Sequence, residues 1–249
     1  MRKENTMERK DFLKKGLGLI GVSSLVIDAC KKDGIVNNDY SEDTAIDESS
    51  LACTRTPAEI EGPFPYPGGE IKNPLNRVDI TEGKPGTPLY LTFIIQNSNN
   101  GCTPVSNARV DIWHCDKDGY YSAYPQSGYL GDIDNTGKTF LRGYQLTNAN
   151  GRCKFTTIYP GWYPGRTTHI HVEVFINGKL KETTQIAFPD KTNHDVYATA
   201  AYAGHGQNTS VLNNRADMAF SDSVASQLVK INSFSATAIY GTSTIKIPG

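Results

Sequence analysis

The 249-residue sequence lacks features that mark several classes of protein. No run of basic residues continues past the first 32 positions, and the formal net charge is only −1, so the chain carries no electrostatic footprint for nucleic acid. No Gly-x-Ser-x-Gly motif occurs, and no single histidine is well placed to act as the base for a catalytic serine. The sequence therefore gives no support for a serine hydrolase. There is no internal repeat. With 38% hydrophobic and 20% charged residues, the composition fits one ordinary domain with a sizeable core.

The apolar run near the N-terminus is too short to span a bilayer. It covers about residues 16–27, follows Arg9, Lys10, Lys14 and Lys15, and has the right length for the core of a signal peptide. It ends at Cys30, and the preceding Ile27-Asp28-Ala29 resembles a bacterial lipoprotein cleavage box. We therefore expect residues 1–29 to be a lipoprotein-type signal and Cys30 to be lipidated. An ordinary secretory signal cleaved elsewhere is the alternative, and residues 8–15 also resemble a relaxed twin-arginine signal.

A polar, acidic stretch follows the expected signal. Residues 30–52 show almost no periodicity, which is typical of a flexible tether between an anchor and a folded body. We expect residues 53–249 to form the folded domain of an exported protein held at the bacterial envelope.

Cysteines are few, and their spacing excludes a zinc-finger site. Apart from Cys30, the chain holds Cys53, Cys102, Cys115 and Cys153. An even number in an exported domain predicts two disulfides, with three possible pairings.

From Thr87 onward the pattern is one of short strands separated by turns. Stretches rich in β-branched and aromatic residues predict strands at residues 89–96, 108–113, 152–159, 168–176, 182–188 and 242–247. Helical signal is confined to residues 195–202 and about 222–231. The pattern predicts an all-β fold, an antiparallel β-sandwich with a few short helices and long loops.

The stretch Tyr163 to His171, YPGRTTHIH, carries candidate metal ligands. In a strand, the two-residue period sends His169 and His171 to one face and Ile170 to the other. Tyr163 lies in a turn from which its phenol can reach the same point. A tyrosinate must lose a proton whose pKa is ordinarily about 10, so it needs a strongly Lewis-acidic metal such as ferric iron. Imidazole also suits zinc and copper, and a His-x-His strand is often plain surface or core alternation.

A second tyrosine comes from VDIWHCDKDGYYS at residues 110–122, where Tyr120 and Tyr121 follow a strand ending near Trp113. At this point the chain resembles the intradiol ring-cleavage dioxygenases, which include catechol 1,2-dioxygenase and protocatechuate 3,4-dioxygenase. The resemblance covers roughly residues 53–202. Its ordered pieces are EGPFP at 61–65, the WHCDKDGYYS block, residues 141–171 and TTQIAF at 183–188.

The resemblance implies a role for each matching residue. Tyr121, Tyr163, His169 and His171 match the four protein ligands of non-haem Fe(3+), with Tyr121 chosen over Tyr120 because the family's ligand lies eight residues after the tryptophan. Arg166 and Gln185 match positions beside the substrate, and Tyr163 matches the tyrosine that is released from iron. Tyr120, Trp162 and the EGPFP segment are candidates for pocket lining. The resemblance also supports the β-sandwich, and suggests that a disulfide at Cys115 braces its loop.

The activity implied is cleavage of a catechol-type ring between its two hydroxyl-bearing carbons. Dioxygen supplies both added oxygen atoms, and the product is a cis,cis-muconate-type diacid. The alternative is an exported β-sandwich module that binds phenolic or polymeric ligands without turnover. His114, His194 and His205 have no partner at ligand spacing and are expected to be structural or surface residues.

The turn at Asn177-Gly178 tests this interpretation. A tight two-residue turn would place Gln185 opposite Ile170, away from the histidines. A three-residue loop of Asn177, Gly178 and Lys179 with a bulge would instead place Gln185 opposite His171. The functional interpretation therefore predicts the bulged loop.

Overall fold

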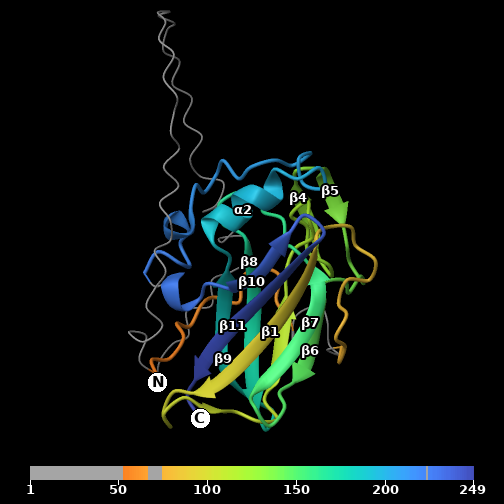
Figure 1. The fold of residues 1–249 in the computed structure, drawn as a ribbon. Coiled ribbons are helices and arrows are strands. Elements are labelled where there is room, and N and C mark those ends of the chain that lie inside the picture. Colours follow the sequence, from red (N-terminus) through yellow and green to blue (C-terminus); the bar gives the residue numbers. More distant parts are fainter. Residues whose placement is uncertain (1–52, 67–74, 223) are drawn as a thin grey trace, which may run out of the picture.

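The fold is a sandwich of two β-sheets, seen in a computed structural model that describes residues 53–66, 75–222 and 224–249 (Figure 1). The first sheet contains β1 (Pro88–Asn97), β2 (Thr103–Pro104), β7 (Arg152–Ile158), β10 (Lys230–Ser235) and β11 (Ala238–Ile247). The second has the order β6 (Arg142–Leu146), β3 (Arg109–Trp113), β8 (His169–Ile176) and β9 (Lys179–Ala187). The expected β-sandwich is thus confirmed. The expected signal and tether lie outside the described residues.

Strict alternation along the strands builds the core between the two sheets. On β1, Leu89, Leu91, Phe93 and Ile95 are buried while the residues between them are partly or fully exposed. On β8, Ile170, Val172 and Val174 join the same core cluster. Because side chains alternate between faces, His169, His171 and Glu173 lie on the opposite face of the second sheet, away from the first sheet. A site made by the two histidines must therefore form on this outer face.

The strands of the two sheets pair antiparallel, as predicted, apart from one pair. Strands β1 and β11 run parallel over residues 89–97 and 239–247. The pairing joins distant parts of the chain, so no turn residue marks it in the sequence. Strands β2, β6 and β10 and the hairpin of β4 (Pro125–Gly128) and β5 (Gly131–Asp134) were also not predicted.

The helical predictions fared unevenly. Helix α2 covers Asp190–Tyr197, earlier than the predicted 195–202, and begins directly after Pro189 with an acidic first turn. The helix predicted at 222–231 is wrong. That region holds only the 3₁₀ turn η2 (Val224–Ser226) before β10 pairs with β11. The strand partner overrides the weak local helix preference.

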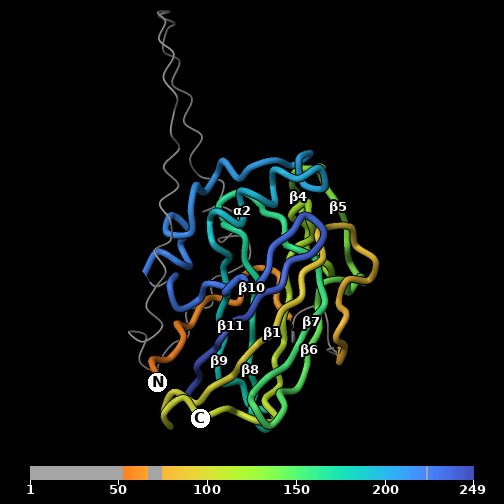
Figure 2. The backbone as a smooth tube through the Cα atoms, viewed as in Figure 1, coloured from red at the N-terminus to blue at the C-terminus, as the bar shows by residue number. Residues whose placement is uncertain are grey.

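The connection between α2 and β10 runs outside the two sheets, and includes the 3₁₀ turn η1 (Asn214–Ala216) (Figure 2). In the described part of the chain, no helix is both long and apolar enough to cross a membrane.

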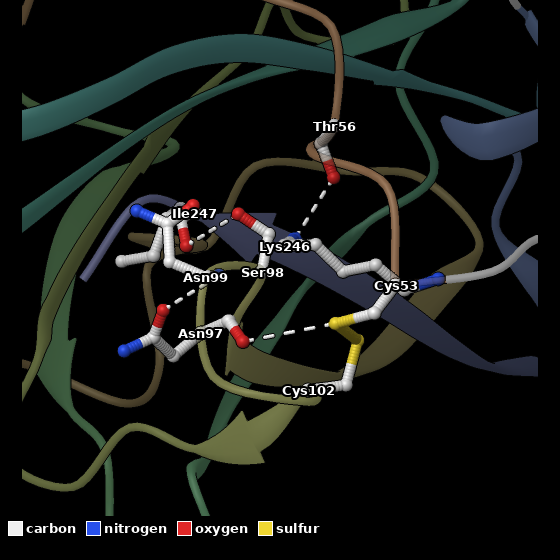
Figure 3. The surroundings of a disulfide bond; sticks show 8 residues. All are labelled: Cys53, Thr56, Asn97, Ser98, Asn99, Cys102, Lys246 and Ile247. Atoms are coloured by element: carbon white, nitrogen blue, oxygen red, sulfur yellow. Dashed lines mark hydrogen bonds between the residues drawn. A yellow bond between two sulfur atoms is a disulfide. The ribbon is translucent and has the colours of Figure 1, made fainter.

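The disulfide prediction is half correct. Cys53 is bonded to Cys102, with the two Cα atoms 5.5 Å apart, and this bond ties the start of the described domain to the turn after β1 (Figure 3). Cys115 and Cys153 are free and buried, so the second disulfide and the brace at Cys115 are wrong. Cys153 lies in the core between the sheets, whereas Cys115 packs in a separate cluster with Trp113 and Tyr121.

The hairpin between β8 and β9 combines parts of both alternatives. The turn is the tight two-residue type, because Ile176 pairs with Lys179 and both Asn177 and Gly178 have positive φ. The predicted three-residue loop is therefore wrong. The bulge lies further along, where the register shifts beside Lys181, and it restores the predicted pairing of His171 with Gln185.

Candidate metal centre

Four donor atoms from three segments meet on the outer face of the second sheet. His169 and His171 are the first and third residues of β8, Tyr163 comes from the loop before β8, and Tyr121 from the loop after β3. Tyr121 Oη lies 3.3 Å from His169 Nε2 and 3.1 Å from His171 Nε2. Tyr163 Oη lies 3.2 Å from His169 Nε2, and the two Nε2 atoms are 3.2 Å apart. All four predicted ligands are thus brought together.

These spacings fit a single bound metal ion. Donor atoms about 2 Å from one centre in a roughly tetrahedral arrangement lie about 3.3 Å from one another. The Nδ1 atom of His169 is 2.7 Å from the carbonyl oxygen of Thr167, so Nδ1 carries the proton and Nε2 presents its lone pair to the centre. Two neutral imidazoles and two phenols form a donor set that suits a hard, strongly Lewis-acidic cation.

Burial by itself favours the neutral form of all four donors. Burial lowers the pKa of His169 and His171 well below the ordinary value, and the charge of Arg166 adds to both effects. Burial raises the pKa of Tyr163 to about 12 and also raises the pKa of Tyr121 well above its ordinary value. A bound cation would convert the two phenols to tyrosinates and would keep the two imidazoles neutral. Elsewhere among the described residues, no group of three or more His, Cys, Asp or Glu is placed to hold a metal.

The adjacent residues Tyr120 and Tyr121 make different contacts in the structure. The Tyr120 hydroxyl donates to the Gly131 carbonyl at 2.8 Å and accepts from the Leu130 amide at 2.7 Å, so it fastens the β4–β5 hairpin. The Tyr121 ring turns the other way and stacks on Phe64, with ring centroids 4.7 Å apart.

The EGPFP segment covers the donors on two sides. Phe64 lies on Tyr121, and Gly62 lies on His171, where a Cβ atom would come within 3.2 Å of Cε1. Gly62 also has a φ of +79°, which favours glycine. The His171 ring also stacks on Trp113, with ring centroids 4.9 Å apart. The lining role predicted for this segment agrees with its position.

Trp162, another predicted lining residue, contacts His205 and Gly206. Its ring stacks on His205 with centroids 4.1 Å apart, and its Nε1–H donates to the Gly206 carbonyl. His114 is fully buried between Cys115 O and Thr157 Oγ1, and burial lowers its pKa to about 4. These contacts agree with structural roles for His114 and His205.

Arg166 and Gln185 are joined by a hydrogen bond beside the four candidate metal ligands. Arg166 Nη2 donates to Gln185 Oε1, and Gln185 Nε2 donates to the Ile60 carbonyl at 2.7 Å. The Nε–H of Arg166 donates to the carboxylate of Asp217, at 2.9 Å from Oδ2. Arg166 Nη1 is buried and has no hydrogen-bond partner among the described residues. Asp217 was missed in the sequence, because it is 51 positions away and no local pattern marks it.

Arg142 is a second residue that sequence reasoning missed. It is fully buried and donates to the carbonyls of Phe64, Pro65 and Ser122 and to the Ser122 hydroxyl. Its guanidinium also lies 5.9 Å from the centre of the Tyr121 ring. Arg142 therefore ties the EGPFP segment to the loop that carries Tyr121. The sequence offered no signal beyond a lone arginine, because the strand that it begins was itself not predicted.

Comparisons with known proteins agree with this geometry. The family described as "Dioxygenase" matches residues 60–224. Catechol 1,2-dioxygenase 1 of Acinetobacter lwoffii is 27% identical over 148 residues, which is 52% of this chain and 45% of that protein. The protocatechuate 3,4-dioxygenase beta chain of Burkholderia cepacia is 31% identical over 140 residues, 50% of this chain and 57% of that protein. The chain thus spans about half the length of the curated relatives it matches.

Among solved structures, the intradiol ring-cleavage dioxygenase from Tetranychus urticae superposes with a TM-score of 0.68 and 30% identity. The match covers 79% of this chain and 95% of that one.

Proposed function

Because the chain belongs to the intradiol ring-cleavage dioxygenase family, we propose that it is a non-haem iron(III) enzyme acting on a catechol-type substrate. It cleaves the ring between the two hydroxyl-bearing carbons and adds both atoms of dioxygen, giving a cis,cis-muconate-type diacid. One observation carries the proposal: two phenol oxygens and two imidazole nitrogens meet within 3.1–3.3 Å at a buried place. Tyr121, Tyr163, His169 and His171 hold the iron. When bound, the iron supplies Lewis acidity and a template for the diol.

The two tyrosines differ in how firmly they are held. Tyr121 is fixed by the Phe64 stack and by a hydrogen bond from Asn135 Nδ2 to its own carbonyl. Tyr163 lies in the loop between Pro160 and Gly165 and keeps 8% of its surface exposed. Tyr163 is therefore the better residue to accept a substrate proton on its Oη and move aside, as the released tyrosine must.

Arg166 supplies positive charge beside the donors. Its Nη1 group is the one guanidinium nitrogen without a hydrogen-bond partner among the described residues, so its N–H bonds remain available to negative charge that develops on the substrate. A hydrogen-bond donor that is already in place at such a position commonly lowers the activation barrier by about 3 kcal/mol. Gln185 holds the Nη2 side of the same guanidinium.

We also propose that the protein is exported and anchored through lipidated Cys30. The Cys53–Cys102 disulfide supports export, because such bonds persist in oxidising compartments.

The proposed function is tested by loading the purified protein with ferric iron and recording the visible spectrum and dioxygen uptake with a panel of substituted catechols. We expect a tyrosinate-to-iron absorption band and consumption of one dioxygen per ring. Tyr163→Phe and His171→Ala should each weaken iron binding, so that absorption and turnover fall together. Binding of catechols without any dioxygen uptake would instead indicate the non-catalytic binding module, and a colourless, iron-free protein after reconstitution would reject the metal centre.

A further inference from the structure

We infer that Asp217 is a positioning residue for Arg166, and that it leaves Nη1 beside the metal centre as the one guanidinium nitrogen without a hydrogen-bond partner among the described residues. The inference rests on the proposed function, in which Arg166 meets charge on the substrate. Asp217 lies directly after η1, in the connection that runs outside the sheets, and its side chain is fully buried.

The carboxylate of Asp217 is saturated with donors. It accepts from Arg166 Nε at 2.9 Å, from the Thr167 amide at 2.6 Å and from the Ala219 amide at 2.8 Å. The Asp217 carboxylate therefore holds both the side chain of Arg166 and the backbone amide of the next residue, Thr167. A charge-assisted pair of this kind is short and directional, so it fixes the plane of the guanidinium as well as its charge.

Each of two guanidinium nitrogens of Arg166 then has its own acceptor. Asp217 takes the Nε side and Gln185 Oε1 takes Nη2. Since the guanidinium is planar and its five N–H donors form a rigid fork, these two contacts determine where Nη1 points. Without Asp217, the fork could rotate about the Gln185 contact, and a positive charge would be buried without its counter-ion.

A neighbouring residue separates positioning from general support of the loop. Asn214 accepts from Thr167 Oγ1 at 2.9 Å and donates to the Phe188 carbonyl at 2.7 Å, so it holds the same turn without touching the Arg166 side chain. Asn214→Ala is therefore the matched control for Asp217→Asn. Asp217→Asn keeps the shape but replaces one acceptor oxygen with a donor, which must face another donor in either orientation.

The test is a double-mutant cycle on the iron-loaded full chain with Arg166→Met, Asp217→Asn and the double variant. We expect Asp217→Asn to keep the wavelength of the tyrosinate-to-iron band and to lower kcat roughly 10- to 100-fold, as loss of a supporting partner does. The double variant should be no slower than Arg166→Met alone, because Asp217 acts only through Arg166. Asn214→Ala should lower thermal stability and keep kcat within about twofold.

A readout independent of turnover is taken on the metal-free protein. The Nε–H signal of Arg166 in a nitrogen-15 NMR spectrum should exchange slowly with solvent in the wild type and in Asn214→Ala, and rapidly in Asp217→Asn. If Asp217→Asn does not fold, Asp217→Glu takes its place in both measurements. Glutamate keeps the charge while displacing the carboxylate.

Unchanged kcat in Asp217→Asn, losses that multiply in the double variant, or unchanged Nε–H exchange would each overturn the inference. An iron-loaded wild type that consumes no dioxygen with any catechol would instead reject the proposed function. In that case the NMR comparison still decides whether Asp217 fixes Arg166.

Discussion

His171 lies directly opposite Gln185 across strands β8 and β9, and the bulge beside Lys181 puts them there. A tight turn without this bulge would place Ile170 opposite Gln185, since a one-residue slip exchanges the two faces of a strand. The glutamine would then point into the sandwich core rather than toward Arg166. The relationship joins the metal centre to the residues that support the guanidinium.

The two adjacent tyrosines give a direct test of the donor set. Tyr121→Phe removes one of the four converging atoms, so iron affinity should fall at least about 10-fold and the absorption band should change. Tyr120→Phe is the matched control, because it loses the hydrogen bonds to Gly131 and Leu130, worth about 1 kcal/mol, and keeps every donor. Titration of the metal-free proteins with ferric iron measures both. Equal affinities of the two variants would contradict the assignment.

Gly62 should tolerate no side chain. Gly62→Ala places a methyl group 3.2 Å from His171 Cε1 and keeps a φ of +79°, which costs about 1 kcal/mol or more in a residue other than glycine. We expect lower thermal stability and weaker iron binding together. Gly83→Ala shares the positive φ, but no atom of the described residues lies within 4 Å of its added methyl group. This control variant should therefore lower thermal stability without weakening iron binding. Unaltered iron affinity in Gly62→Ala would show that the His171 ring can shift freely.

Arg142→Lys should loosen the EGPFP segment and the Tyr121 loop together. Lysine keeps the charge but cannot make the four hydrogen bonds of the buried fork, and we expect a loss of roughly 2–4 kcal/mol in the free energy of unfolding. Hydrogen exchange should increase at both segments. Arg152→Lys, at an exposed arginine of β7, should change neither by a comparable amount. Protection that decreases in only one of the two segments would contradict the link.

The Cys53–Cys102 disulfide should stabilise the domain substantially. Chain-entropy arguments for a loop of 49 residues give about 4 kcal/mol, which denaturation of the Cys53→Ser/Cys102→Ser double variant measures. Cys115 and Cys153 should not react with thiol reagents in the native protein, because both are buried and burial raises the pKa of Cys153 to about 12. Unfolding without reductant should expose both. Finding neither thiol would indicate a second disulfide.

Asp111 should make stability depend on pH. Burial raises its pKa to about 6, although its ion pair with Arg109 opposes the rise. The folded pKa lies above the ordinary value of 3.8, so this contribution is fully present below about pH 4 and is lost as pH rises through about 6. The wild type should therefore lose up to about 3 kcal/mol relative to Asp111→Asn between pH 4 and 7. Urea denaturation at both pH values measures the difference, and a constant difference would contradict the raised pKa.

The sequence by itself determined the elements whose signals are local. Alternation predicted β1, β3, β7 and β8 to within about two residues, and the same two-residue period put His169 and His171 on one face. The four donors and the pair Arg166 and Gln185 were assigned from short motifs in chain order, through the resemblance of these motifs to the intradiol ring-cleavage dioxygenases. These features need only neighbouring residues to be specified.

Tertiary structure decided what depends on distant partners. The parallel pairing of β1 with β11, the strand at Lys230–Ser235 and the free state of Cys115 and Cys153 follow from which surfaces pack together. Asp217 and Arg142 acquire their roles in the same way, because a buried charge takes its partner from whatever the fold brings within reach. Burial then sets the pKa of each donor, and no periodicity in the chain encodes the depth at which a side chain comes to lie.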